Sequence, residues 1–267
     1  MAKVEILSSP SNPLLKDVRR AVVRGELTDQ GWMVAETFHL FEEALRSDLE
    51  VKVVLAAQAV RSTVESHVRR LAGMRVAVVP DDLFQKLAGT ESTQGVIALV
   101  EPPSWTLEQL FRGRSLIVAL DGVQDPGNAG AIARTAEAFG ATGVMFLKGT
   151  ASPFHPKTLR ASAGSLFRVP FVSGLDGMLV RASLKQNRLD TYSAVPHGNL
   201  PSASLPKVDL RRRCAIVIGS EGRGVSEALR SGALDLSIPT IAVESLNAAV
   251  AAGIILYEAR RQRSLPQ

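Results

Sequence analysis

The sequence predicts an α/β protein built from two successive blocks. Short apolar runs typical of buried strands alternate with segments whose apolar residues recur at helical spacing. This alternation is typical of a sheet with helices packed on its faces. It occurs on both sides of Pro102-Pro103, a pair that cannot continue a strand ladder and that favours an extended linker. We therefore expect one domain over residues 1–103 and another over residues 104–267, both of ordinary size.

The first block opens with a basic helix predicted over residues 12–24. Pro13 lies near its start, where proline is tolerated because the first helical N–H has no partner in the helix. A second helix over residues 37–46 carries its apolar residues at helical spacing, Leu40 and Phe41 among them. The predicted strands of this block are 32–35, 51–56, 75–79 and 95–100. Its remaining predicted helices are 60–71 and 81–87.

The second block has the pattern of a mostly parallel sheet. Its predicted strands are 115–120, 144–147, 191–195, 214–218 and 234–238, and its helices are 128–139, one within 156–167, and 248–263. The helix over 128–139 turns Ile132 toward the core and stops at Gly140. The last helix is expected to bury Leu246, Val250 and Ile254.

Composition narrows the class of protein. A hydrophobic content of 46% supports well-formed cores. No apolar run reaches the roughly 18 residues of a membrane span, and the first residues lack a signal-peptide pattern, so we expect a cytoplasmic protein without membrane contact. The one cysteine, Cys214, excludes an intrachain disulfide and a cysteine-rich zinc site. Because it stands in an apolar strand, it is predicted to be a buried, inert thiol.

Charge is distributed unevenly along the chain. Residues 1–103 hold 12 Lys and Arg against 14 Asp and Glu, whereas residues 104–267 hold 19 against 12. A basic second block suits a polyanionic partner such as nucleic acid, although a solvated basic surface explains the same numbers.

Three polar loops follow strands of the second block. The first contains Asn128 and, six residues later, Arg134. The second is Gly219-Ser220-Glu221-Gly222-Arg223-Gly224, and the third is Ser245-Leu246-Asn247. Loops at the carboxyl ends of neighbouring parallel strands can build one site. Each loop also has a structural explanation: a helix cap with a surface arginine, a tight turn with a solvated glutamate, and a second helix cap.

The glycine-rich loop argues against two enzyme classes. Its spacing differs from the G-x-G-x-x-G of dinucleotide-binding folds, and it lacks the Lys-Ser/Thr of a P-loop. A nicotinamide-dependent dehydrogenase and an NTPase are therefore disfavoured.

Taken in order, the three loops resemble the signature motifs of the SpoU (TrmH-type) branch of the SPOUT RNA methyltransferases. Arg160-Ala161-Ser162-Ala163-Gly164 and Phe171 are similar to an intermediate segment of that family. The first block resembles its L30e-like substrate-binding domain, and Thr93-Gln94-Gly95-Val96 is similar to the closing strand of that domain. The resemblance covers nearly the whole chain, although the segment 239–245 is shorter here and lacks a glycine.

The resemblance implies a fold and an activity. The second block would be a SPOUT α/β domain with a trefoil knot, which dimerises and can share its active site between subunits. The activity would be transfer of a methyl group from S-adenosyl-L-methionine to a ribose 2′-hydroxyl of structured RNA, without a metal. Ribosomal RNA of the 23S type is the first expectation for the substrate. A tRNA 2′-O-methyltransferase, a related enzyme that methylates a base, and a non-catalytic RNA-binding protein are the alternatives.

The resemblance also assigns residues to the site. The catalytic set would be Arg134, Asn128, Glu221, Ser245 and Asn247. The backbone around Gly219, Ile238 and Leu246 would hold the cofactor. Arg134 would act at the hydroxyl, either as a base or by stabilising the developing alkoxide. Stabilisation is the physically safer role, because an arginine with a pKa above 12 is a poor base.

Overall fold

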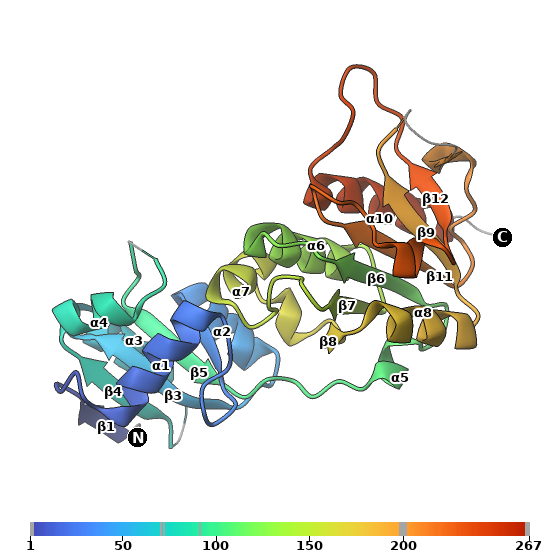
Figure 1. Ribbon diagram of the computed structural model, residues 1–267. Helices are drawn as coiled ribbons and strands as arrows, with labels where there is room; N and C mark the ends of the chain where they lie inside the picture. Colours follow the sequence, from blue (N-terminus) through green and yellow to red (C-terminus); the bar gives the residue numbers. More distant parts are fainter. Residues whose placement is uncertain (1–2, 70, 72, 91, 198–201, 265–267) are drawn as a thin grey trace. The chain divides into compact units, whose positions relative to one another are not determined.

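A computed structural model describes residues 3–69, 71, 73–90, 92–197 and 202–264 (Figure 1). Its contacts divide the chain into two compact units. The first comprises Met1–Ser104 and Phe154–Phe167, and the second comprises Trp105–Pro153 and Arg168–Gln267. The division of the sequence at 103/104 stays a prediction, and the structure adds that a segment from the second half of the chain packs with the first unit.

The first unit is a five-stranded mixed sheet covered by helices on both faces, in the strand order β1-β4-β3-β5-β2. Its strands are β1 (Lys3–Ile6), β2 (Met33–Glu36), β3 (Val51–Ala57), β4 (Arg75–Val79) and β5 (Val96–Val100). Its helices are α1 (Pro13–Arg24), α2 (Phe38–Arg46), α3 (Arg61–Val68), α4 (Asp81–Leu87) and α7 (Pro156–Ser162). Strand β5 runs antiparallel to β2 and β3, and the other pairs are parallel.

The elements of the first unit follow local sequence signals. The Asn12 side chain accepts the backbone N–H groups of Leu14 and Leu15 and so begins α1, while Gly25 ends it at a φ of 67°. Helices α1 and α4 bury their apolar faces in one core beneath the sheet. The predicted helix over 60–71 is wrong in its extent, because a 3-10 turn occupies Gln58–Val60 and α3 ends at Val68; residue 70 lies outside the described residues. Strand β1 carried no sequence prediction.

The second unit is a seven-stranded sheet in which all neighbouring strands are parallel, in the order β10-β12-β9-β11-β6-β7-β8. Its strands are β6 (Leu116–Asp121), β7 (Gly143–Leu147), β8 (Phe171–Leu175), β9 (Asp190–Val195), β10 (Ala203–Ser204), β11 (Cys214–Gly219) and β12 (Leu234–Ser237). Its helices are α5 (Leu107–Leu110), α6 (Pro126–Ala138), α8 (Gly177–Gln186), α9 (Glu227–Arg230) and α10 (Ala248–Ser264). Strand β8 and helix α8 had no sequence prediction.

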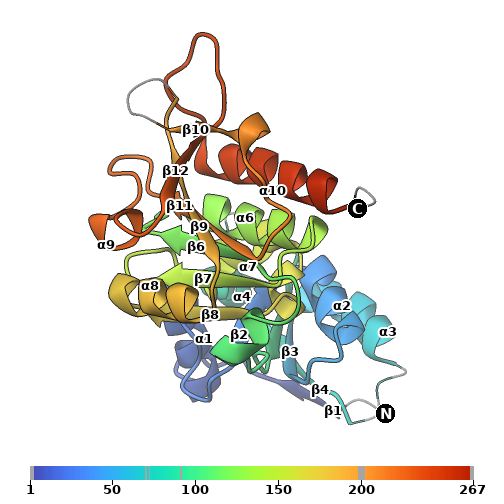
Figure 2. The ribbon, with the colours of Figure 1, turned by 90° about the vertical axis from the view of Figure 1, so that its right-hand side faces the viewer.

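Helices cover both faces of this parallel sheet, as buried parallel strands require. Ile117 and Ala119 of β6 face a core shared with α5, α8 and α9. Helices α6 and α10 lie side by side over the opposite face (Figure 2). The predicted mixed α/β architecture is thereby confirmed. Within the described residues, every helix is too short or too polar to span a bilayer.

The C-terminal helix contradicts one sequence prediction. Leu246, Val250 and Ile254 were expected in the core, yet Leu246 is half-buried and precedes the helix, and Val250 and Ile254 are 51% and 39% exposed. The residues of α10 that are buried are mostly small: Ala248, Ala252, Ile255, Leu256 and Ala259. Helix α10 packs against α6, and small side chains let the backbones of two helices approach each other.

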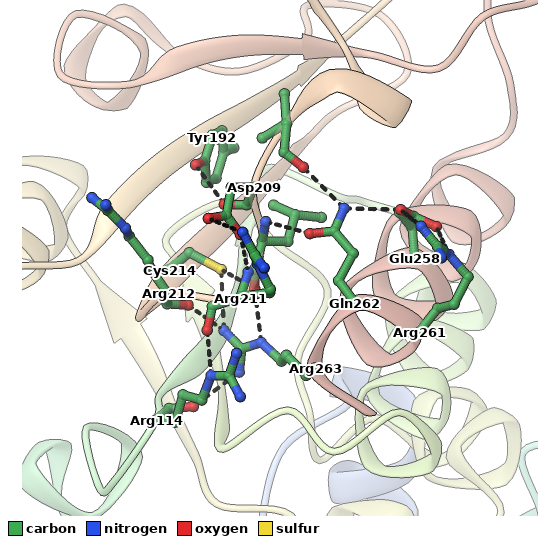
Figure 3. A network of polar contacts seen from close by, with 12 residues as sticks. Arg114, Tyr192, Asp209, Arg211, Arg212, Cys214, Glu258, Arg261, Gln262 and Arg263 are labelled. Carbon is green, nitrogen blue, oxygen red and sulfur yellow. Dashed lines mark hydrogen bonds and ion pairs between the residues drawn. The ribbon is translucent and has the colours of Figure 1, made fainter. Parts of the chain in front are cut away.

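The far end of α10 is fixed to the sheet by a polar network (Figure 3). Arg263 donates to the carbonyl oxygens of Leu210 (2.9 Å), Arg114 (2.9 Å) and Arg212 (2.6 Å). Cys214, at the start of β11, is fully buried beside it, and burial raises the pKa of its thiol to about 11. The predicted buried, inert thiol is therefore confirmed, since the reactive thiolate is scarce at neutral pH.

Candidate active site

The three polar loops meet at one edge of the parallel sheet. They follow β6, β11 and β12, and β9 lies between β12 and β11 in the sheet. Because these strands are parallel, their carboxyl ends lie at the same edge, where α/β sheets bind ligands. The loop after β9, beginning with Pro196 and His197, therefore belongs to the same edge.

Hydrogen bonds join one residue from each loop. The Asn128 amide nitrogen donates to Glu221 Oε1 at 2.5 Å, and the Asn247 amide nitrogen donates to Asn128 Oδ1 at 3.1 Å. Asn247 Oδ1 in turn accepts the backbone N–H groups of Ala249 and Val250 at 2.9 and 3.3 Å, so it caps α10. The start of a helix thus holds a chain of side chains that ends at a carboxylate.

The start of α6 differs from the prediction. The helix was expected to begin at Asn128, with the Asn128 side chain as a possible cap. It begins at Pro126 instead, and the Asp125 side chain accepts the Asn128 backbone N–H at 2.8 Å. Proline is favoured at the first helical position, so the Asp125-Pro126 pair sets this start. The Asn128 side chain is consequently free to bond Glu221.

The glycine-rich loop after β11 is a tight turn. Ser220 and Gly224 exchange two backbone hydrogen bonds, of 3.2 and 2.9 Å, and Gly224 has a φ of 67°. A methyl group placed on Gly219 would lie 2.1 Å from the carbonyl carbon of Gly224, so only glycine fits there. The Ser226 N–H donates to Asp121 Oδ2 at 2.7 Å, which fixes this loop to the end of β6.

A cavity of about 360 Å³ lies beside this loop. Gly219, Ile238 and Leu246, the three residues expected at the cofactor, all line it, as do Glu221 and Ser245. Other lining residues were not predicted from the sequence: Ala194, Pro196, His197, Arg230, Thr240 and Glu244. The end of β9 could have been found from the sequence, because a parallel strand in that place delivers its following loop to the same edge.

A second cavity, of about 420 Å³, lies against the same glycine-rich loop. Polar residues dominate its lining, among them Asp121, Gln124, Lys148 and Arg223. The first cavity, by contrast, has apolar walls from Ile218, Leu236 and Ile255 as well as polar groups. One loop therefore borders a partly apolar cavity and a polar one.

Arg134 lies apart from the hydrogen-bonded group of Asn128, Glu221 and Asn247. It lies six residues after Asn128, about 240° round the helix, and lines neither cavity. Its side chain is exposed and has no hydrogen bond or ion pair with any residue that the structure describes. Within one chain, the structure thus brings together Asn128, Glu221 and Asn247 but leaves Arg134 apart.

Comparison with known proteins identifies the family. Residues 115–257, which include all three loops, match the SpoU rRNA Methylase family, and residues 12–98 match the MRM3-like substrate binding domain. The chain belongs to the SpoU rRNA methylase family. It is 33% identical to the 23S rRNA (guanosine(2553)-2′-O)-methyltransferase RlmP of Bacillus subtilis, over 95% of this chain and 98% of that one.

Solved structures of the family agree with the fold. An RNA 2′-O ribose methyltransferase superposes with a TM-score of 0.80 at 30% identity, covering 98% of this chain and all of that one. The SpoU methyltransferase AviRb of Streptomyces viridochromogenes, solved with AdoMet, gives a TM-score of 0.79 at 27% identity, over 94% and 99% of the two chains. The predicted family is confirmed, and with it an S-adenosylmethionine-dependent RNA 2′-O-methyltransferase activity. The trefoil knot stays a prediction.

The first cavity suits S-adenosylmethionine in its chemistry. Apolar side chains can pack on the nucleoside and on the methylene groups of the methionine chain, and the few polar groups can fix their orientation. Gly219 and Gly224 keep the loop free of side chains where the backbone approaches the cavity. Among the described residues, no group of three or more His, Cys, Asp or Glu could hold a metal ion.

Proposed function

We propose that this protein methylates a ribose 2′-hydroxyl of 23S-type ribosomal RNA in the cytoplasm. The hydrogen-bonded chain Asn247–Asn128–Glu221 beside the cofactor-sized cavity carries the proposal. The full-length similarity to a 23S rRNA methyltransferase supports this RNA over tRNA. Mapping 2′-O-methyl groups in total RNA from cells with and without the protein tests it: one 23S position should lose its methyl group, and loss confined to tRNA would contradict the substrate.

We assign the reaction to residues on either side of the glycine-rich loop. Bound S-adenosylmethionine supplies a methyl group already activated on a sulfonium. The cluster orients the nucleotide: Asn247 is fixed by the start of α10 and holds Asn128, which holds Glu221. Ser245, exposed at the rim of the cofactor cavity, is free to hydrogen-bond the ribose. The polar cavity, with Gln124 and Lys148, receives the substrate strand.

We further propose that Arg134 completes the site of a second copy of the chain. It lies on α6, next to Thr135, which contacts α10. Val250, Ile254 and Tyr257 form an exposed apolar strip on α10, and the Tyr257 ring stands edge-on to Phe139 of α6 at 5.7 Å. A homodimer through this face would bury the strip and carry Arg134 to the partner's ribose. There its guanidinium would stabilise the oxygen as negative charge develops on it, while the hydroxyl proton passes to solvent and the sulfonium leaves as a thioether.

Cofactor binding should need no metal. Calorimetry of the purified protein with S-adenosylmethionine should give about one site per chain, or fewer if only one site of a dimer fills, and a chelator should not change the affinity. The apolar walls of the cavity predict a negative heat-capacity change on binding. Absence of binding at millimolar cofactor, with RNA present, would contradict the enzymatic assignment.

The exposed face of α1 is expected to bind RNA. Lys16 and Arg19 are exposed and make no ion pair within the described residues, whereas Arg20 is held by Asp17 at 2.6 Å and Asp29 at 2.8 Å. Lys16→Ala/Arg19→Ala should raise KM for RNA and leave kcat unchanged, because phosphate contacts that do not involve the reacting group act equally on ground and transition states. Kinetics at varied RNA concentration measure this, and an unchanged KM would place recognition elsewhere.

The full chain is the right material for that test. Residues 1–103 alone would lack Arg160, which pairs with the buried Glu36 of the same unit. A fragment could therefore lose RNA affinity through misfolding. The cofactor affinity of the double variant should equal that of the wild type and serves as its control.

A further inference from the structure

Much of the excess positive charge of residues 104–267 lies at one place in the fold. Folding brings the segment before β6 against the segment before β11. The contact is made by Arg114, which donates to the carbonyl oxygen of Arg211, and by Arg213, which donates to that of Phe111 at 2.9 Å. We call the resulting group the arginine cluster; it consists of Arg112, Arg114, Arg211, Arg212 and Arg213.

Few carboxylates neutralise the arginine cluster. Arg211 pairs with Asp209 at 2.9 Å. Arg114 and Arg213 donate to carbonyl and hydroxyl oxygens, which leaves their charge uncompensated. Arg112 and Arg212 are exposed and have no side-chain hydrogen bond or ion pair in the described part of the chain. The other acidic residue close by, Asp190, is exposed at the start of β9.

The cluster is held on a rigid base. The half-buried guanidinium of Arg263 reaches both segments and fixes their backbone through the carbonyl oxygens of Arg114 and Arg212 (Figure 3). Gln262 adds bonds of 2.8 Å to the Leu210 N–H and 2.9 Å to the Val208 carbonyl oxygen. The fixed backbone presents the five arginines together, and guanidinium groups suit phosphate oxygens.

The position of the cluster separates it from the reaction. It precedes the first residues of β6 and β11, whereas the candidate active site follows their last residues. Six residues of strand span about 20 Å. Arginines at this distance cannot touch the ribose that reacts, but they can touch the same RNA about six stacked nucleotides away, at roughly 3.4 Å per nucleotide.

We propose that the arginine cluster is a second RNA-binding surface. It lies at the edge of the sheet opposite the active site and binds the phosphate backbone of the substrate. The proposal rests on the proposed RNA methyltransferase function. RNA is favoured over an acidic protein because the substrate already lies on this unit. Phosphate contacts of this kind add affinity without reading sequence.

The test compares Arg112→Ala/Arg212→Ala with Lys185→Ala. Both sets remove exposed cations whose side chains have no hydrogen bond or ion pair in the described chain, but Lys185 lies in the last turn of α8, outside the arginine cluster. Binding to 23S rRNA transcribed in vitro is measured against salt concentration. The slope of log affinity against log salt should fall by about 1.4 to 1.8 for the double variant, because each phosphate contact contributes about 0.7 to 0.9. Lys185→Ala should keep the wild-type slope.

The outcomes separate this proposal from the function on which it rests. The double variant should bind an unrelated structured RNA of equal length with the same reduction, and its cofactor affinity and melting temperature should match the wild type. If the salt slope of the double variant equals that of the wild type, the proposal that the arginine cluster binds RNA is wrong. Wild-type protein that binds 23S rRNA but methylates no RNA overturns the proposed function, while the salt slopes still decide the role of the cluster.

Discussion

Replacing Arg134 with alanine is expected to lower the single-turnover rate of RNA methylation by about 100-fold or more, which is the usual cost of removing a group that stabilises a developing oxyanion. Cofactor affinity should not change, because Arg134 lines neither cavity. Stability should change little, since the side chain is exposed and forms no hydrogen bond or ion pair with the described residues. Arg134→Lys should also fail, because an ammonium group cannot replace the planar donor fork. Rapid-quench methylation, cofactor titration and thermal melting measure the three quantities.

Mixing two inactive variants tests whether Arg134 acts on the partner's site. Glu221→Ala removes the carboxylate from the Asn247–Asn128–Glu221 chain and keeps Arg134. Arg134→Ala removes the guanidinium and keeps that chain. If Arg134 acts across the dimer, exchange of subunits creates one site with both groups intact, and part of the activity returns. No recovery in a mixture of proven heterodimers would place Arg134 in the site of its own chain. A near wild-type rate for Arg134→Ala would remove it from the reaction altogether.

The sequence predicted the parts of the site that depend on parallel-strand topology. Glu221 was placed correctly just after β11, and Asn247 just before α10, because apolar runs mark the strands and polar loops follow them. The start of α6 was misplaced because Asp125 and Asn128 are both good caps. Pro126 decides between them, and the consequence is functional: the Asn128 side chain is available to Glu221.

The residues that the sequence misplaced on α10 show where patterns fail. Large apolar residues usually mark a core face, so Val250 and Ile254 were assigned to it. The helix instead buries Ala252 and Ala259, because helices that approach as closely as α6 and α10 need small side chains between them. Periodicity alone cannot distinguish a helix face that is buried in the core of its own chain from one that is exposed and could bind a partner.

The packing of residues 154–167 with the first unit could not be predicted from the sequence either. It depends on a buried ion pair. Glu36, at the end of β2, has a side chain only 3% exposed. It accepts the Gly89 N–H at 2.5 Å and pairs with Arg160 of α7, whose side chain is 26% exposed. Burial raises the pKa of the Glu36 carboxyl, while the Gly89 N–H and Arg160 oppose that rise. Nothing in the sequence links residues 36 and 160, which are far apart along the chain.

Arg160→Ala should therefore destabilise the first unit by about 3 kcal/mol at pH 8, near the lower end of the cost of breaking a buried pair, because Arg160 is partly exposed. A carboxyl whose pKa is higher folded than unfolded destabilises the fold as pH rises through these values. Losing Arg160 raises the pKa of Glu36 further, so the cost should shrink at pH 5, where protonation relieves the buried charge. Urea unfolding followed by Trp32 fluorescence, in a Trp105→Phe background, reports on this unit. The matched control is Arg61→Ala, which breaks an exposed pair with Glu65 in the same unit and should cost little at either pH. If Arg160→Ala destabilises the protein no more than Arg61→Ala does, or by the same amount at both pH values, the buried pair does not hold 154–167 to this unit.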